Sequence, residues 1–170
     1  MFTILKIVGA SLAALMLLYV LAAAIVGRTE LLALLFGPVE REAVDFLTLD
    51  RRATPNDFLA CPAEVCAAEA DVESPVIRES IDHLRLRFLE EVAARPRLTL
   101  LASNPVLDQY DVEERSALFG FPDTMTVRLF ERRDGTSTVA VYSRSHYGRG
   151  DLGVNEARVR AWLKDLEAVP

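Results

Sequence analysis

The hydrophobic and polar positions divide the chain into an apolar beginning and a patterned remainder. From Ile7 to Gly27 no residue carries a charge. A helix rises about 1.5 Å per residue, so this stretch crosses a bilayer core roughly 30 Å thick and predicts a transmembrane anchor. The alternative is a cleavable signal peptide, because Ala22, Ala23 and Ala24 resemble a cleavage site. The apolar run is longer than a usual signal core, which favours the retained anchor.

Two later segments show the spacing of amphipathic helices. Ser74 and Pro75 are typical of the cap and first residue of a helix that ends before Pro96. Nearer the C-terminus, Asn155 is expected to cap a second helix. Apolar residues recur every three or four positions in both segments, which predicts one buried face on each. These faces consist of Ile77, Ile81, Leu84, Phe88 and Val92, and of Val159, Trp162, Leu163 and Leu166.

Strand patterns lie between the two helices. Residues 97–100 and 124–129 alternate between apolar and polar, and residues 110–119 are rich in β-formers. Asp134 and Gly135 predict a hairpin turn whose return strand is 137–143. The expected fold class is therefore α+β, with an antiparallel sheet of three to four or more strands. Two amphipathic helices should cover one of its faces.

The expected organisation has four parts. Residues 1–6 form a tail, 7–27 the transmembrane anchor, 28–48 a juxtamembrane linker, and 49–170 a soluble α+β domain. The lead-in 37–74 contains several turn and breaker signals and is expected to be irregular.

Charge limits the partners and suggests an orientation. The chain has 19 Lys and Arg against 25 Asp and Glu, a formal net charge of −6. A basic footprint for nucleic acid is absent from this composition. Only Lys6 precedes the anchor among the basic side chains, and a short basic tail usually stays in the cytoplasm. We therefore expect a single-pass protein of the inner (cytoplasmic) membrane, with its soluble domain in the periplasm.

The segment 143–155 concentrates glycine, arginine and small polar residues before the last helix. Arg144 and Arg149 carry planar donors that suit carboxylate or phosphate, and a helix start favours an anion. The alternative is a glycine-rich crossover in which Asp151 and Asn155 bond their own backbone and Arg144 pairs with an acid. The predicted ligand-binding residues are Ser143, Arg144, Ser145, Asp151 and Asn155.

The same residues form a motif that resembles a known family. The motif is Ser143-Arg144-Ser145-x-x-Gly-x-Gly-Asp-Leu-Gly-Val-Asn155-x-x-Arg158-Val159, and residues 55–62 and 121–124 also fit. It resembles the signature of domain-of-unknown-function family 1499, a bacterial and plastid family, over about residues 49–166. The resemblance implies that the motif residues are shared and that the context is membrane-associated. It supplies no activity, substrate or cofactor.

Cysteine and histidine offer little for metal chemistry. Cys61 and Cys66 are expected to form a disulfide, to remain free or buried thiols, or to serve a metal or redox site. Their spacing is not Cys-x-x-Cys, and His83 and His146 are the only histidines. No metal and no cofactor are therefore predicted.

Three functions remain open. The favoured one is a non-catalytic, membrane-tethered module that presents the 143–155 loop to a protein partner or to an anionic or amphipathic ligand. An enzyme is less favoured, and would be a membrane-bound hydrolase or transferase acting on a phosphorylated or lipid-like substrate. There Arg144 would stabilise negative charge while His146 or Asp151 moved protons. The third is a thiol redox role for Cys61 and Cys66.

Overall fold

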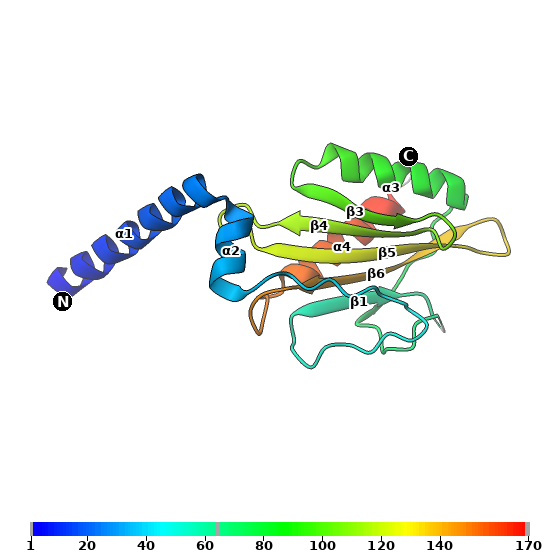
Figure 1. Ribbon diagram of the computed structural model, residues 1–170. Coiled ribbons are helices and arrows are strands. Elements are labelled where there is room, and N and C mark those ends of the chain that lie inside the picture. The colour runs from blue at the N-terminus through cyan, green and yellow to red at the C-terminus, as the bar shows by residue number, and fades with distance from the viewer. Residues whose placement is uncertain (1, 64, 169–170) are drawn as a thin grey trace. The chain divides into compact units, whose positions relative to one another are not determined.

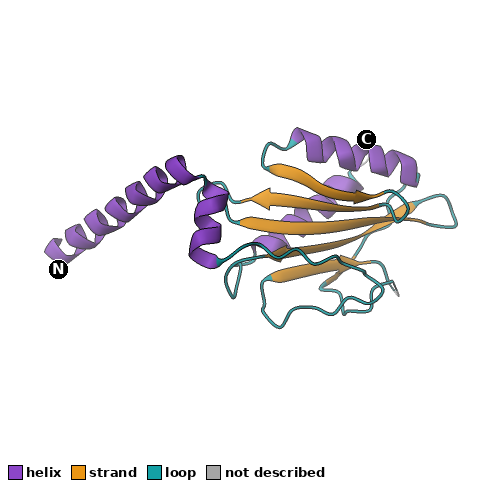
Figure 2. Ribbon diagram, viewed as in Figure 1, coloured by secondary structure: helices purple, strands orange, loops and turns teal. Residues whose placement is uncertain are grey.

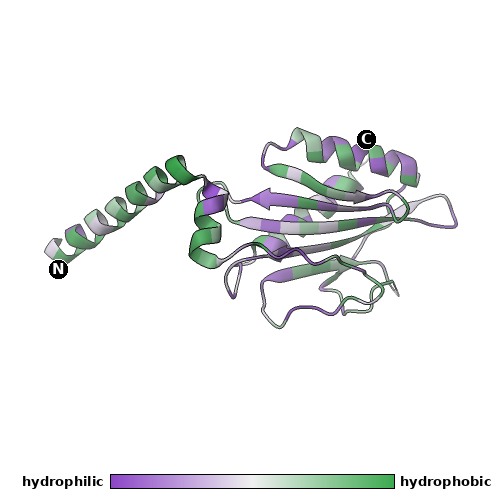
Figure 3. Ribbon diagram, viewed as in Figure 1, coloured by the Kyte–Doolittle hydropathy of each residue, from purple (hydrophilic) through white to green (hydrophobic). Residues whose placement is uncertain are grey.

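The computed structural model describes residues 2–63 and 65–168. It divides into two compact units, Met1–Glu40 and Arg41–Pro170. The first unit contains helices α1 (Phe2–Val26) and α2 (Arg28–Phe36). Helix α1 is long and apolar enough to cross a membrane, and its surface is predominantly hydrophobic (Figure 3).

The second unit is built on a six-stranded sheet with strand order β2-β1-β6-β5-β4-β3 (Figures 1 and 2). Every neighbouring pair is antiparallel except β1 and β2, which are parallel. Strand β6 lies inside the sheet, and all of its residues are buried. The strands are β1 (Asp57–Cys61), β2 (Val72–Glu73), β3 (Leu98–Asn104), β4 (Gln109–Arg115), β5 (Pro122–Glu131) and β6 (Ser137–Ser145).

Helices α3 (Ile81–Ala94) and α4 (Val154–Glu167) pack on one face of this sheet. Their buried stripes meet alternate residues of β4, β5, β6 and β1, since side chains on a strand alternate between faces. Phe88 stands at the centre, with its ring 5.4 Å from Trp162 and 5.3 Å from Tyr110. The expected α+β class, with two amphipathic helices on a sheet, is confirmed.

The opposite face of the sheet carries a cover that the sequence did not predict. Residues 41–52, which we call the strap, run across it, while the loop after β1 folds against the same side (Figure 1). Together they bury a second, smaller core. This core contains Val44, Phe46, Leu59, Cys61, Ala140 and Tyr142.

Hydrogen bonds from sheet side chains fix the strap. Arg144 Nη2 donates to the carbonyl oxygen of Glu42 at 3.0 Å, and Gln109 Nε2 donates to that of Val44 at 2.8 Å. Phe46 has no exposed surface. These contacts tie the strap to the sheet, and the compact unit includes the chain from Arg41 onward.

Helix α3 begins later than expected. The prediction that Ser74 caps a helix starting at Pro75 is wrong, because Ser80 is the cap and its hydroxyl accepts from the His83 amide. Ile77 instead pairs with Ser137 in an isolated antiparallel bridge. Two backbone hydrogen bonds of 2.8 and 2.9 Å hold that bridge and keep the preceding chain extended.

Two further predictions need correction. Helix α4 is capped by Gly153 rather than Asn155, which lies inside the first turn. The lead-in 37–74 is not wholly irregular, because it contains β1 and β2. Strand β1 pairs with β6 over four positions and is therefore an interior part of the sheet.

Candidate functional site

Strand β6 separates the predicted ligand-binding residues onto two faces of the sheet. Ser143 and Ser145 face the helices, where both contact Asn155. Arg144 lies between them in sequence and points to the strap instead. This follows from the two-residue period of a strand. The residues that the sequence grouped together therefore form two separate polar environments.

On the helix side, Asn155 organises a buried hydrogen-bond network and has no exposed surface. Its Oδ1 accepts from the Ser143 hydroxyl at 2.6 Å. Its Nδ2 donates to Ser145 Oγ at 3.0 Å and to the carbonyl oxygen of Asn56 at 2.9 Å. The network joins α4 to β6 and to the residue before β1, so these side chains stabilise the fold.

Arg158 completes the network, a role that the sequence reasoning did not assign. Its Nη1 donates to Asn155 Oδ1 at 2.7 Å. The same guanidinium forms ion pairs of 2.7 Å with Glu114 and 2.6 Å with Asp123. A signal was present in the sequence, because Arg158 follows Asn155 by three residues and therefore lies on the same helix face.

Asp151 holds the turn into α4. Its carboxylate accepts from the backbone amides of Gly153 at 3.1 Å and Asn155 at 2.8 Å. Burial opposes ionisation, but these hydrogen bonds outweigh it and lower the pKa of Asp151 below its usual value. Asp151 thus satisfies amides at the helix start, the role predicted for Asn155.

On the strap side, Arg144 is 2% exposed. Its Nη1 donates to Thr126 Oγ1 at 3.1 Å, and its guanidinium carbon lies 5.3 Å from the Tyr142 ring centroid. The Thr126 hydroxyl in turn donates to Asp111 Oδ1 at 2.6 Å. Burial lowers the pKa of Arg144, and the charge of Asp111 partly opposes that effect.

Thr124 and His146 form a close pair next to Arg144. The Thr124 hydroxyl and His146 Nε2 are 2.6 Å apart, and Thr124 is almost wholly buried. Burial, together with the positive charges of Arg144, Arg52 and Arg41, lowers the pKa of His146 to about 4. The imidazole is therefore neutral near pH 7.

Several cavities border the segment 143–155, and three of them bear on the predicted site. One of about 370 Å³ lies between residues 116–123 and residues 145–154. The other two lie on the strap side, have volumes of about 180 and 270 Å³, and share Arg144 and Glu42 in their walls.

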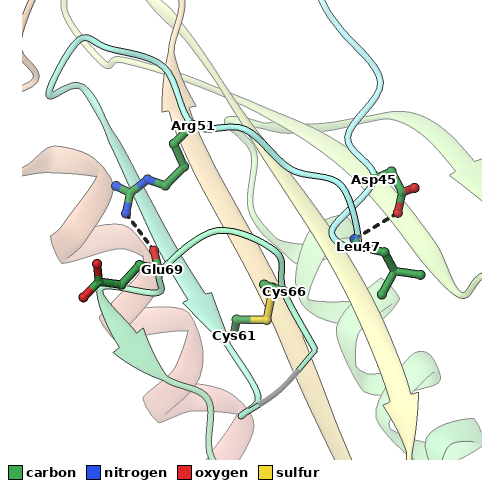
Figure 4. The surroundings of a disulfide bond; sticks show 6 residues. All are labelled: Asp45, Leu47, Arg51, Cys61, Cys66 and Glu69. Carbon is green, nitrogen blue, oxygen red and sulfur yellow. Dashed lines mark hydrogen bonds between the residues drawn. A yellow bond between two sulfur atoms is a disulfide. The ribbon is translucent and has the colours of Figure 1, made fainter.

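Cys61 and Cys66 are joined by a disulfide that closes the loop after β1 (Figure 4). Arg51 of the strap donates to the carbonyl oxygen of Glu69 in the same loop at 3.2 Å. Cys61 and Cys66 both pack in the smaller core. The bond thus braces the surface on which the strap lies.

The motif residues, now placed in the fold, coincide with a family model. The model described as "Protein of unknown function (DUF1499)" matches residues 53–166. The chain belongs to this family. The DUF1499 match includes the whole Asn155 network, both cysteines and every strand of the sheet. No curated protein sequence matches the chain, and no solved structure does.

Proposed function

We propose that this DUF1499 protein is a single-pass, membrane-anchored binding module without catalytic activity. Helix α1 would hold it in the inner membrane of a bacterial cell, with the second unit in the periplasm. Its contact surface would be the exposed apolar rim of the 143–155 segment, which would meet a protein partner or an amphipathic ligand. The observation that carries the proposal is the conformation of Leu152.

Leu152 is held in solvent by an unfavourable backbone conformation. Its φ angle is 55°, in the left-handed region that leucine rarely adopts, and its side chain is fully exposed. The turn holds that angle, because Asp151, directly before Leu152, accepts from the amides of Gly153 and Asn155, which follow it. Strain of this kind costs about 1–3 kcal/mol and tends to occur at functional positions.

The cavity of about 370 Å³ beside Leu152 supplies the rest of the surface. Its walls include the apolar or aromatic side chains of Phe121, Pro122, Tyr147 and Val154. Asp123 also lines it, but this carboxylate forms an ion pair with Arg158. Polar side chains of the segment form hydrogen bonds inside the domain, so the groove offers mainly apolar contact. A groove with apolar walls and a few polar groups suits an amphipathic ligand.

The disulfide supports the periplasmic placement. Disulfides persist in oxidising compartments and are rare in the cytosol. The test uses cells in which the outer membrane is permeabilised and the inner membrane is intact. A membrane-impermeant maleimide should label Cys61 and Cys66 in these cells only after reduction. Labelling that requires lysis of the inner membrane would place the domain in the cytoplasm instead.

Site-specific photocrosslinking tests the contact surface. A photoreactive phenylalanine analogue replaces Leu152 in the full-length protein in cells, and mass spectrometry identifies the adduct. Val106 is the matched control, because it is an aliphatic residue with 91% exposure in the turn between β3 and β4. We expect one protein or one lipid class to be captured from position 152 and not from 106. Equal adducts from both positions, or none from 152, would refute the proposal.

The Thr124–His146 pair favours one second candidate, the hydrolase or transferase. A hydroxyl 2.6 Å from a neutral imidazole is the geometry of an activated nucleophile, and Arg144 lies nearby to stabilise an anion. This candidate expects the full-length protein to hydrolyse p-nitrophenyl acetate or phosphate. Loss of that turnover in both Thr124→Val and His146→Gln would establish it, and no turnover by the folded wild-type protein would exclude it for these substrates.

A further inference from the structure

The guanidinium of Arg144 is a buried positive charge without a carboxylate bonded to it. Its hydrogen-bond partners are the neutral Thr126 hydroxyl and the carbonyl oxygen of Glu42. These contacts use two of the five N–H donors of a guanidinium. Across residues 2–63 and 65–168, none of the ion pairs includes Arg144. A buried charge is costly unless it is paired, so this arrangement favours an anion from outside the chain.

Three more arginines lie near Arg144 or the carboxylates around it. Arg41 and Arg115 both form ion pairs with the same carboxylate, Glu113. Arg52 donates to the carbonyl oxygen of Ser145 at 3.2 Å, a neutral partner. The lowered pKa of His146 has the same origin, since burial and three of these guanidinium groups all disfavour its protonated form. These arginines attract an anion at Arg144, whereas Glu42 and Asp111 in the same cavity wall oppose a second negative charge.

Only one of the two strap-side cavities suits an anion. The cavity of about 180 Å³ includes Asp45 and Asp50 in its walls, and these carboxylates would repel negative charge. The cavity of about 270 Å³ combines Arg144 and Arg41 with the Thr124 hydroxyl. Its acidic side chains are Glu42 and Asp111, and Asp111 is already hydrogen-bonded by Thr126.

A bulge in the edge strand β3 gives this larger cavity an apolar wall. Leu100 pairs with Val112 and Ala102 with Asp111, so Leu101 has no partner on β4. Bulges change the direction of a side chain and are common next to functional sites. Leu101 and Ala102 both line the cavity, together with Ala43 of the strap.

From these contacts we propose that the cavity between the strap, β3 and Arg144 binds an organic monocarboxylate with a short apolar chain. The planar guanidinium of Arg144 matches a carboxylate, and the Thr124 hydroxyl lies within the same cavity. Leu101 and Ala102 contact the apolar chain. The ligand carries a single charge, because Asp111 in the wall disfavours a dianion such as phosphate. This site is on the opposite side of the sheet from the Leu152 surface and does not depend on it.

Calorimetric titration of the full-length protein in detergent micelles tests the proposal, with sodium butyrate as the probe. We expect saturable binding that 1-butanol and sodium phosphate do not reproduce at equal ionic strength. Leu101→Glu introduces a negative charge into the apolar wall and should weaken butyrate binding at least tenfold. Leu107→Glu is the matched control, because Leu107 and Leu101 are both 39% exposed and Leu107 does not line the cavity.

Substitutions of Arg144 need a check that the domain still folds, because this side chain also holds the strap. Arg144→Gln should abolish butyrate binding, whereas Arg144→Lys, which retains the charge, should restore part of it in a protein with native Trp162 fluorescence. Three outcomes would overturn the proposal: no saturable butyrate binding to the folded wild-type protein, equal binding by Leu101→Glu and Leu107→Glu, or phosphate binding tighter than butyrate. A negative photocrosslinking result at Leu152 would leave this site unaffected.

Discussion

Replacing Asn155 by alanine should destabilise the domain more than most single substitutions. The side chain is fully buried, and it takes part in four hydrogen bonds, with Ser143, Ser145, Arg158 and the carbonyl oxygen of Asn56. Alanine removes all four and leaves several of the partners without a bond in a buried environment.

The expected loss in the free energy of unfolding follows from the number of hydrogen bonds removed. A hydrogen bond contributes about 0.5–1.5 kcal/mol net, so four give about 4 kcal/mol. The ion pairs of Arg158 with Glu114 and Asp123 remain in the variant, which limits the loss. A domain of this size is stable by about 5–15 kcal/mol, so Asn155→Ala should remove a large part of that margin.

Urea unfolding of the full-length protein in detergent micelles measures the effect. Trp162 is the single tryptophan of the chain and is 2% exposed, so its fluorescence reports on this domain and not on helix α1. Asn104→Ala is the control, because Asn104 is exposed and its side chain accepts from the local amides of Val106 and Leu107. A loss below about 1 kcal/mol in Asn155→Ala, with an unchanged urea slope, would refute the assigned role of the network.

Three further perturbations follow from the structure. Replacing Cys61 and Cys66 together by alanine should lower the free energy of unfolding by about 2 kcal/mol, as expected for closing a short loop, measured by the same urea titration. His146 has its pKa lowered to about 4 by burial and nearby arginines. The unfolded chain therefore binds a proton that the folded chain does not, and stability should fall as the pH drops from about 6.5 to about 4, an effect that His146→Gln reduces. Ser80→Ala should cost about 1 kcal/mol through loss of the α3 cap, whereas Ser74→Ala should cost less.

A specific result would contradict each of these three predictions. Reduction of the wild-type protein without any loss of stability would contradict the disulfide prediction. Identical urea midpoints at pH 7 and pH 5 for the wild-type protein, relative to His146→Gln, would contradict the histidine prediction. If Ser74→Ala lowered the free energy of unfolding more than Ser80→Ala, that result would support a helix that begins at Pro75. The hydroxyl of Ser74 is buried without a hydrogen-bond partner among the described residues, so its removal should be nearly neutral.

The fold class was predictable because its main elements have regular periods. The stripe from Ile81 to Val92 and the alternation in β5 depend on local spacing, which a sequence displays directly. The start of α3 was not predictable in this way. Ser74 and Pro75 have the chemistry of a helix start, but the long-range bridge between Ile77 and Ser137 decides the local conformation.

Strand β1 was missed for a related reason. Its residues Phe58 to Cys61 are all buried, so it shows no alternation of apolar and polar positions. A strand covered on both faces reads as a short apolar run. The cover on its second face comes from the strap and the disulfide loop, and neither has a periodic pattern of its own.

The candidate site was predictable as a set of residues but not as a geometry. Ser143, Arg144 and Ser145 are consecutive, and treating them as part of a loop placed them together. Because they end β6, the strand period sends Arg144 to the opposite face. The role of Asn155 depends on Asn56, which is distant in sequence and close only in the fold.

The strap also has a mechanical consequence. The compact unit begins at Arg41, so tension applied to the chain before Arg41 reaches the strap before any strand of the sheet. The first attachments under load are the ion pair between Arg41 and Glu113 and the single hydrogen bonds from Arg144 to Glu42 and from Gln109 to Val44. These can break one after another, whereas the β5–β6 ladder resists as a unit. We therefore expect the strap to peel from the sheet at low force, lengthening the tether while the rest of the domain stays folded.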